Sequence, residues 1–199
     1  MGSTTKAELR AALLAARRAV APEVKQAESN RLCAHLGDAV AGARTVCAYL
    51  PLGSEPGSVA LLDRLRELGI VVLLPVARTG PGGEHLPLQW GEYLPGQLVD
   101  APFGLTEPAE PWLPPQAVAR ADVVLVPALA VDRGGVRLGR GGGFYDRSLV
   151  LCAPGTRLCA VVRDDEMLTE LPAEPHDVPM THALTPGAGL ITLGMTDGQ

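Results

Sequence analysis

Short runs of branched apolar residues recur along this chain, and stretches with a helical pattern separate them. The clearest runs are 45–50 (TVCAYL), 70–74 (IVVLL), 121–126 (ADVVLV) and 157–162 (RLCAVV). Such runs are typical of strands buried on both faces, which occur in parallel sheets covered by helices. The sequence therefore predicts an α/β fold with three layers, in which helices flank a central, mostly parallel sheet. No linker interrupts the pattern, so we expect a single domain over residues 1–199.

Helix signals fill the gaps between these runs. The predicted helices cover residues 5–20, 22–39, 58–68 and 144–151. Thr5 and Glu8 have the spacing of a capping box at the start of the first helix, and Pro22 suits the first turn of the second. Weaker strand candidates are 86–93 and the residues around Ala183 and Leu190. The segment from Pro95 to Pro115 is rich in proline and has no period, so we expect a loop or a lid-like connection.

The overall charge argues against a protein that binds nucleic acid. The formal net charge is −5 and aromatic residues make up 4% of the chain, whereas such proteins usually carry a basic patch or stacking rings. No pair of the four cysteines has C-x-x-C spacing, which favours reduced cysteines in the cytosol. Residues 1–9 contain no apolar signal region, and no apolar run is long enough to cross a bilayer. We therefore expect a cytoplasmic protein without a nucleic-acid or membrane partner.

A glycine-rich segment follows the clearest predicted strand. It reads VPALAVDRGGVRLGRGGGFYD over residues 126–146 and leads into the fourth predicted helix. Ligands of open α/β sheets bind outside the carboxyl ends of the strands, and glycine N–H groups near a helix start attract anions. The segment matches neither the Walker A loop nor the dinucleotide fingerprint. A mobile connection would also contain glycines, but Arg137 and Arg140 favour a phosphate-binding loop.

Other charged residues allow two interpretations. Asp146 lies just inside the predicted helix start, where either the helix dipole or a bound Mg²⁺ would favour a carboxylate. Lys6, Arg10 and Arg17 share one face of the first helix beside an apolar stripe, and such a face can point into a cleft. For Arg17 and Arg18 we expect ordinary exposure to solvent.

The segment 139–146 (GRGGGFYD), with 126–132 (VPALAVD) before it, resembles the signature of 5-formyltetrahydrofolate cyclo-ligases. Three further matches follow the family's order: Lys6 with Arg10, Tyr49-Leu50-Pro51 with Glu55, and 174–179 (EPHDVP). Together the matches span nearly the whole chain. The resemblance implies a Rossmann-like fold related to the sugar-phosphate isomerase and CoA-transferase type.

The resemblance also implies a set of site residues. ATP would be held by Lys6, Arg10, Arg137, Leu138, Gly139, Arg140, Gly141, Gly142, Gly143, Phe144 and Tyr145. A reduced folate would be contacted by Leu50, Glu55, Arg140, Gly141, Gly142, Gly143 and Phe144. Mg²⁺ would be bound by Asp146 and Asp177. We expect the catalytic residues to be Arg140, Lys6 and Arg10, and the protein to be a monomer or a weak homodimer.

Three positions depart from the pattern common in the family. Gly142, Thr181 and Phe144 stand where many members carry lysine, aspartate and tyrosine. At Gly142 one phosphate contact is either missing or supplied by the backbone, whereas a carboxylate at position 181 and a hydroxyl at position 144 are absent. The family reaction transfers a phosphoryl group from ATP to the formyl oxygen of 5-formyltetrahydrofolate, after which N10 closes the ring to 5,10-methenyltetrahydrofolate. Two other functions stay open: a sugar-phosphate isomerase-like enzyme that needs no ATP, and a non-catalytic regulator that binds folate or nucleotide.

Overall fold

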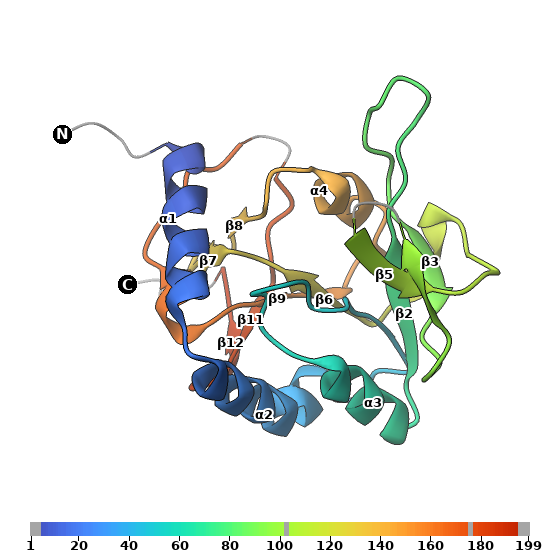
Figure 1. The fold of residues 1–199 in the computed structure, drawn as a ribbon, viewed down its shortest axis with the longest axis horizontal. Helices are drawn as coiled ribbons and strands as arrows, with labels where there is room; N and C mark the ends of the chain where they lie inside the picture. The colour runs from blue at the N-terminus through green and yellow to red at the C-terminus, as the bar shows by residue number, and fades with distance from the viewer. Residues whose placement is uncertain (1–4, 102–103, 175–176, 195–199) are drawn as a thin grey trace.

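The computed structural model describes residues 5–101, 104–174 and 177–194. Its centre is a seven-stranded sheet with the order β12-β11-β9-β6-β1-β2-β3 (Figure 1). The strands are β1 (Thr45–Cys47), β2 (Val71–Val76), β3 (Gln89–Glu92), β6 (Val123–Pro127), β9 (Arg157–Val161), β11 (His182–Thr185) and β12 (Gly189–Thr192). The five strands from β11 to β2 run parallel, and β12 and β3 are antiparallel edges. The predicted α/β fold with a mostly parallel sheet is confirmed.

Helices cover both faces of this sheet. They are α1 (Lys6–Ala19), α2 (Pro22–Ala39), α3 (Val59–Glu67) and α4 (Phe144–Leu149), with short 3-10 turns η2 (Pro115–Arg120) and η3 (Asp164–Glu166). Figure 1 shows α2 and α3 along one side of the sheet, and α4 on the other. The predicted capping box is present, since the Glu8 carboxylate accepts the N–H of Thr5 at 2.8 Å. Within the described ranges, no helix is long and apolar enough to cross a membrane.

Side chains alternate across the sheet and form a core on each face. Val46 and Leu125 point toward α2 and α3, where they join one buried cluster. The neighbouring residues Cys47 and Val124 point the other way, into a cluster that includes Leu149 of α4. Because both faces are apolar, the strands read as continuous apolar runs in the sequence, which is why their positions could be predicted.

The glycine-rich segment is more regular than the predicted loop. Strands β7 (Ala130–Asp132) and β8 (Arg137–Leu138) form a hairpin within it, and β7 also pairs with β10 (Met167–Leu168). Two features fix the turn between the strands. Gly135 has a φ of +92°, and a β-carbon there would collide with the carbonyl oxygen of Met180. Leu9 and Leu13 of α1 pack on this small sheet, so the first helix lies beside the glycine-rich segment.

Asp132 is the buried polar residue that holds this hairpin. Its carboxylate accepts the N–H groups of Val136 and Leu171, both at 2.9 Å. We expect Asp132→Ala to lower the free energy of unfolding by about 2–4 kcal/mol, because one buried and one half-buried N–H donor lose a charged acceptor. Urea denaturation would measure the change. The exposed Asp38 gives a matched control, and a loss of less than about 0.5 kcal/mol in Asp132→Ala would contradict this role.

The proline-rich segment from Pro95 to Pro115 also contains regular structure. It forms an antiparallel hairpin of β4 (Leu98–Ala101) and β5 (Leu105–Pro108), so the expectation of an irregular loop is wrong over these residues. The buried Glu107 accepts two hydrogen bonds from Arg78, at 2.9 and 2.5 Å, which fastens the hairpin to the residues after β2. The Arg78 guanidinium also lies 4.1 Å from the centre of the Trp112 ring. A role of the segment as a lid stays a prediction.

Candidate active site

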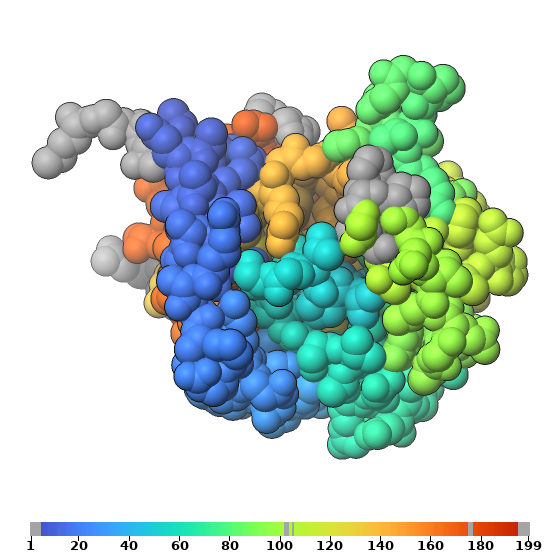
Figure 2. All heavy atoms as spheres, in the orientation of Figure 1, coloured from blue at the N-terminus to red at the C-terminus, as the bar shows by residue number. Residues whose placement is uncertain are grey.

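The segment Gly139–Gly143 connects β8 to α4 and forms a wall shared by two cavities. Gly141 and Gly143 have φ angles of +97° and +69°, which side chains rarely adopt, so glycine is needed for this tight turn. Arg10 of α1 donates from Nε to the carbonyl oxygen of Gly139 at 2.9 Å. Figure 2 shows the segment (gold) at the surface, with α1 (blue) on one side and the segment after β1 (cyan) below.

The first cavity is polar and has a volume of about 580 Å³. Its walls come from α1, the glycine-rich segment, α4 and the segment before β11. The lining residues are Lys6, Arg10, Arg137, Leu138, Gly139, Gly141, Gly142, Gly143, Asp146, Arg147, Val150, Glu174 and Asp177. Most residues predicted to hold ATP, and both predicted magnesium ligands, therefore meet in one place. Arg147 was not predicted from the sequence, although its position one residue after Asp146 placed it on the same helix start.

Each predicted magnesium ligand is paired with a predicted phosphate-binding cation. Arg137 Nη2 lies 2.6 Å from Asp146 Oδ1, and Lys6 Nζ lies 3.2 Å from Asp177 Oδ2. Lys6 is also 3.2 Å from Glu174 Oε1. A bound phosphate chain with its cation can replace these pairs, because each partner would gain an ion of opposite charge.

The two carboxylates Asp146 and Asp177 suit Mg²⁺ better than a metal ion whose ligands all come from the protein. The described ranges contain no group of three or more His, Cys, Asp or Glu residues that could hold a metal ion. Mg²⁺ commonly takes one or two carboxylates and completes its octahedron with substrate phosphates and water. Asp146 and Asp177 line the same cavity as the cations and meet that requirement.

The second cavity is mostly apolar and has a volume of about 320 Å³. It lies at the carboxyl ends of β1, β2 and β6. Its lining includes Arg17, Tyr49, Leu50, Leu52, Glu55, Leu74, Pro75, Ala77, Leu88, Thr106, Glu107, Pro127, Leu129, Arg140, Phe144 and Tyr145. All residues predicted to contact a folate line this cavity. Arg140, Phe144 and Tyr145 were also predicted to hold ATP, but they line this cavity and not the polar one.

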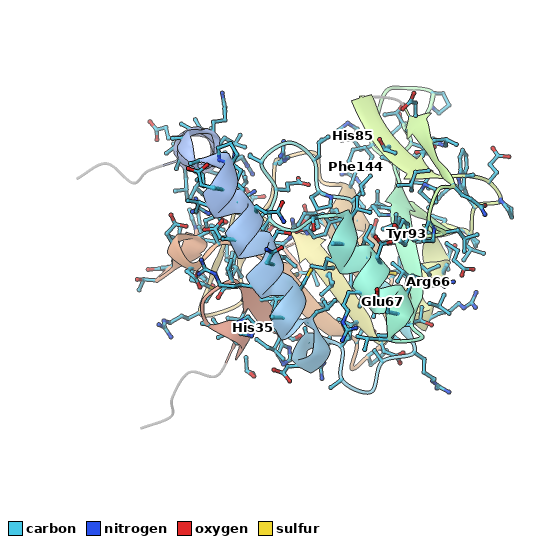
Figure 3. All side chains as sticks on the ribbon, turned by 60° about the horizontal axis from the view of Figure 1, so that its bottom comes forward. His35, Arg66, Glu67, His85, Tyr93 and Phe144 are labelled. Atoms are coloured by element: carbon cyan, nitrogen blue, oxygen red, sulfur yellow. The ribbon has the colours of Figure 1, made fainter. Side chains whose placement is uncertain are left out.

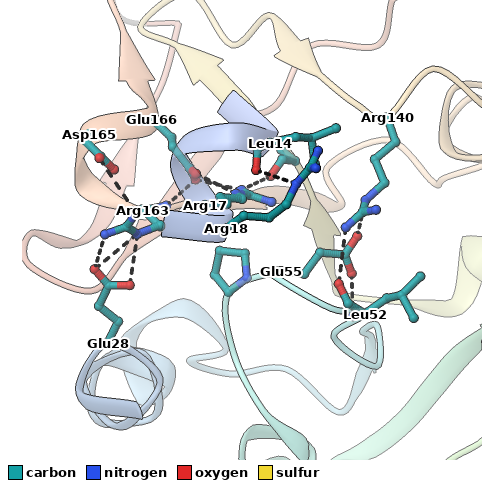
Figure 4. Close-up of polar contacts among 12 residues, drawn as sticks. Leu14, Arg17, Arg18, Glu28, Leu52, Glu55, Arg140, Arg163, Asp165 and Glu166 are labelled. Atoms are coloured by element: carbon teal, nitrogen blue, oxygen red, sulfur yellow. Dashed lines mark hydrogen bonds and ion pairs between the residues drawn. The ribbon is translucent and has the colours of Figure 1, made fainter. Parts of the chain in front are cut away.

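Glu55 and Arg140 link the two loops at the mouth of the apolar cavity. Arg140 Nε lies 2.9 Å from Glu55 Oε1, and Arg140 also donates to the Leu52 carbonyl oxygen at 3.2 Å (Figure 4). The other oxygen of Glu55 accepts the N–H of Leu52 at 2.9 Å. The family resemblance assigned Glu55 to the residues that contact a folate. The structure places its side chain in the cavity wall with 11% of its surface exposed.

Two rings border the glycine-rich segment, and one of them was not predicted. His85, from the long hairpin after β2, stacks on Phe144 with ring centres 4.2 Å apart (Figure 3). Its Nδ1 lies 2.5 Å from the carbonyl oxygen of Gly142. Burial, and then the charge of Glu55, raises the pKa of Tyr145, so its hydroxyl stays protonated.

The sequence also singled out Arg17 with Arg18, Thr181 and the acidic motif 174–179. Arg17 is buried, with 1% of its surface exposed, so the expectation of a solvated side chain is wrong; Arg18 is exposed as expected. Thr181 bonds to the backbone of Leu158 and lines neither cavity. Residues 175–176 of the acidic motif (Pro175 and His176) lie outside the described ranges.

Comparison with known proteins connects this geometry to one family. The model of the 5-formyltetrahydrofolate cyclo-ligase family matches residues 2–186. The 5-formyltetrahydrofolate cyclo-ligase of Mycolicibacterium smegmatis is 58% identical over 193 residues, which cover 97% of this chain and 100% of that protein. The Escherichia coli (strain K12) protein of the same name is 31% identical over 85% of this chain and 94% of its own. The Aquifex aeolicus 5,10-methenyltetrahydrofolate synthetase structure aligns with a TM-score of 0.78 at 25% identity, covering 98% of this chain and 95% of that one.

Proposed function

The chain belongs to the 5-formyltetrahydrofolate cyclo-ligase family, a family of enzymes, and we propose that it converts 5-formyltetrahydrofolate to 5,10-methenyltetrahydrofolate with ATP and Mg²⁺. The observation that supports this most is the wall shared by two unlike cavities. One cavity is lined by cations and carboxylates and suits a phosphate chain with its metal ion, whereas the other is mostly apolar and suits a ring system. A reaction between a nucleotide and a folate requires such a junction.

The proposal assigns ATP to the polar cavity. Lys6, Arg10 and Arg137 would face its phosphates, and the N–H groups of Gly139–Gly143 would bind oxygens at the wall. Asp146 and Asp177 would hold Mg²⁺. When bound, this ion would neutralise charge on the phosphate oxygens during transfer.

The apolar cavity is assigned to the reduced folate. The Glu55 carboxylate can accept two N–H bonds from the amino-pyrimidine edge of a pterin, as a carboxylate does from an arginine fork. Leu50 and Phe144 supply apolar contact for the ring system. The formyl group would then lie at the glycine-rich wall, where the terminal phosphate of ATP can reach it.

The reaction needs positioning and charge neutralisation more than a protein nucleophile. The formyl oxygen attacks the terminal phosphorus, and ADP leaves with the electrons of the broken P–O bond. N10 then attacks the activated formyl carbon and loses its proton. The C–O bond breaks, phosphate leaves with the former formyl oxygen, and the methenyl bridge remains. Lys6, Arg10 and Arg140 would act as the catalytic cations in these steps.

The first test is an assay in which the protein is mixed with 5-formyltetrahydrofolate, ATP and Mg²⁺. The near-ultraviolet absorbance of the methenyl product measures its formation. We expect an increase that requires both ATP and Mg²⁺. Tight binding of folate or nucleotide without an increase would favour a regulator. The absence of both, together with nucleotide-free activity on sugar phosphates, would favour an isomerase-like enzyme. The cytoplasmic location and the monomeric or weakly dimeric state stay predictions.

A further inference from the structure

Arg17 of α1 is a buried cation that the proposed function leaves without a role. It lies in the wall of the apolar cavity with 1% of its surface exposed. Its Nε and Nη2 bond to the two carboxylate oxygens of the buried Glu166 at 2.6 and 2.7 Å. Nη2 also donates to the carbonyl oxygen of Ala128 at 2.5 Å. The charge of Arg17 is therefore balanced and its guanidinium is held in one orientation.

The third nitrogen of this guanidinium has no acceptor within the described part of the chain. Among the described residues, Arg17 Nη1 is one of only three buried side-chain nitrogen or oxygen atoms without a hydrogen-bond partner. The guanidinium is planar, so turning its Nε–Nη2 edge toward Glu166 leaves Nη1 on the opposite edge. Figure 4 shows Glu166 on one side of Arg17, and Glu55 and Arg140 on the other. A buried donor of this kind requires an explanation, and an acceptor carried by the ligand provides one.

Two other groups in the same wall indicate the chemistry of that ligand. The ionised Glu55 carboxylate is a hydrogen-bond acceptor and not a donor, whereas the Arg17 guanidinium is a donor and not an acceptor. Both residues lie close enough to Tyr49 to affect the pKa of its buried hydroxyl. Burial raises this pKa, the charge of Glu55 raises it further, and the charge of Arg17 lowers it. Tyr145 Oη, also in this wall, is a second buried polar atom without a partner in the described ranges.

An acceptor and a donor in one wall match a ring edge that presents N–H groups beside a carbonyl oxygen. The amino-pyrimidine ring of a pterin has that edge, with the 2-amino group, the N3–H and the C4 carbonyl oxygen in sequence. We propose that Arg17 determines specificity for 4-oxo pterins by donating from Nη1 to the C4 carbonyl oxygen, while Glu55 accepts from the neighbouring N–H groups. This inference rests on the proposed function. It adds that the cavity recognises the C4 carbonyl oxygen of the folate.

Substitution Arg17→Lys separates this role from a structural one. Lysine keeps a positive charge for Glu166 but loses the rigid fork that presents Nη1. We expect the dissociation constant of 5-formyltetrahydrofolate, measured without ATP, to rise by about 10- to 100-fold. The dissociation constant of the analogue with an amino group in place of the 4-oxo group should change less than about threefold, since it lacks the acceptor. The preference for the 4-oxo ligand therefore falls by about the same 10- to 100-fold.

The adjacent residue provides the matched control. Arg18 is exposed and donates from Nε to the Leu14 carbonyl oxygen, so Arg18→Lys makes the same chemical change outside the cavity. We expect it to leave both dissociation constants unchanged. If Arg17→Lys does not fold, the double variant Arg17→Met with Glu166→Gln removes both charges of the pair and leaves no buried ion unpaired. It should lose the same preference.

The outcomes are distinguishable. An unchanged preference for the 4-oxo ligand in the folded Arg17 variant, or equal weakening of both ligands, would overturn the inference and leave the proposed function standing if the wild-type protein turns over. Failure of the wild-type protein to bind 5-formyltetrahydrofolate would overturn the proposed function, and the inference with it. A loss of affinity for the 4-oxo ligand alone supports both the inference and the proposed function.

Discussion

Replacing Arg140 with alanine should lower turnover of 5-formyltetrahydrofolate by about 10²- to 10³-fold, the loss typical of one removed electrostatic contact to a transition state. Arg140 lies between Gly139 and Gly141, which both border the polar cavity, while its own side chain lines the apolar one. Its guanidinium is thus placed where phosphate and formyl groups would meet. The substitution also removes the 2.9 Å contact that holds Glu55.

The fold should tolerate this change. The Arg140 side chain is 43% exposed, and Glu55, although only 11% exposed, keeps the Leu52 N–H as a hydrogen-bond partner, so we expect only a small loss of stability. Arg66→Ala is the matched control, because Arg66 also forms a 2.9 Å pair with a glutamate, Glu92, and lines neither cavity. Steady-state kinetics and thermal unfolding of both variants would separate activity from stability. Near-normal turnover in Arg140→Ala would contradict the assignment of the site.

Replacing Asp146 with asparagine should also lower turnover by about 10²- to 10³-fold and raise the Mg²⁺ concentration needed for half-maximal rate by about 10- to 100-fold. The variant keeps the shape of the side chain and removes the charge. It leaves Arg137, whose side chain is only 6% exposed, without the ionised partner that lies 2.6 Å away. The remaining cation would interact with the phosphates but could not replace a metal ligand.

A titration of rate against Mg²⁺ at fixed ATP would test this prediction. Asp165→Asn is the control, because Asp165 is 67% exposed and its partner Arg163 lies 3.9 Å away, outside both cavities. An unchanged half-maximal Mg²⁺ concentration in Asp146→Asn would show that Asp146 is not a ligand. Its position at the start of α4 would then reflect the helix dipole, the other interpretation that the sequence allowed.

Much of the fold could be predicted because it depends on local patterns. The parallel strands are apolar on both faces, and α1 begins at a capping box that four consecutive residues define. The short strands β7 and β8 could not be predicted, since they contain only 3 and 2 residues and β7 also pairs with the distant β10. The β4–β5 hairpin depends likewise on Arg78, which is 29 residues from its partner Glu107.

The site shows the same division between local and distant information. The contiguous motif Gly139–Asp146 could be recognised because its residues are adjacent in sequence, and the structure places all of them at the two cavities. The burial of Arg17 could not be predicted, since its partner Glu166 lies 149 residues away and the helix pattern does not distinguish it from Arg18. His85 was missed for a similar reason, because its contact with Phe144 joins two segments that share no motif.

The most direct test of the proposed reaction follows the formyl oxygen. The protein would be incubated with 5-formyltetrahydrofolate carrying ¹⁸O in the formyl group, with ATP and Mg²⁺, and the released phosphate analysed by mass spectrometry. If the formyl oxygen is phosphorylated before ring closure, the label appears in inorganic phosphate in equal amount to the methenyl product. Methenyl product formed with unlabelled phosphate would contradict the account, because the oxygen would then leave by another route.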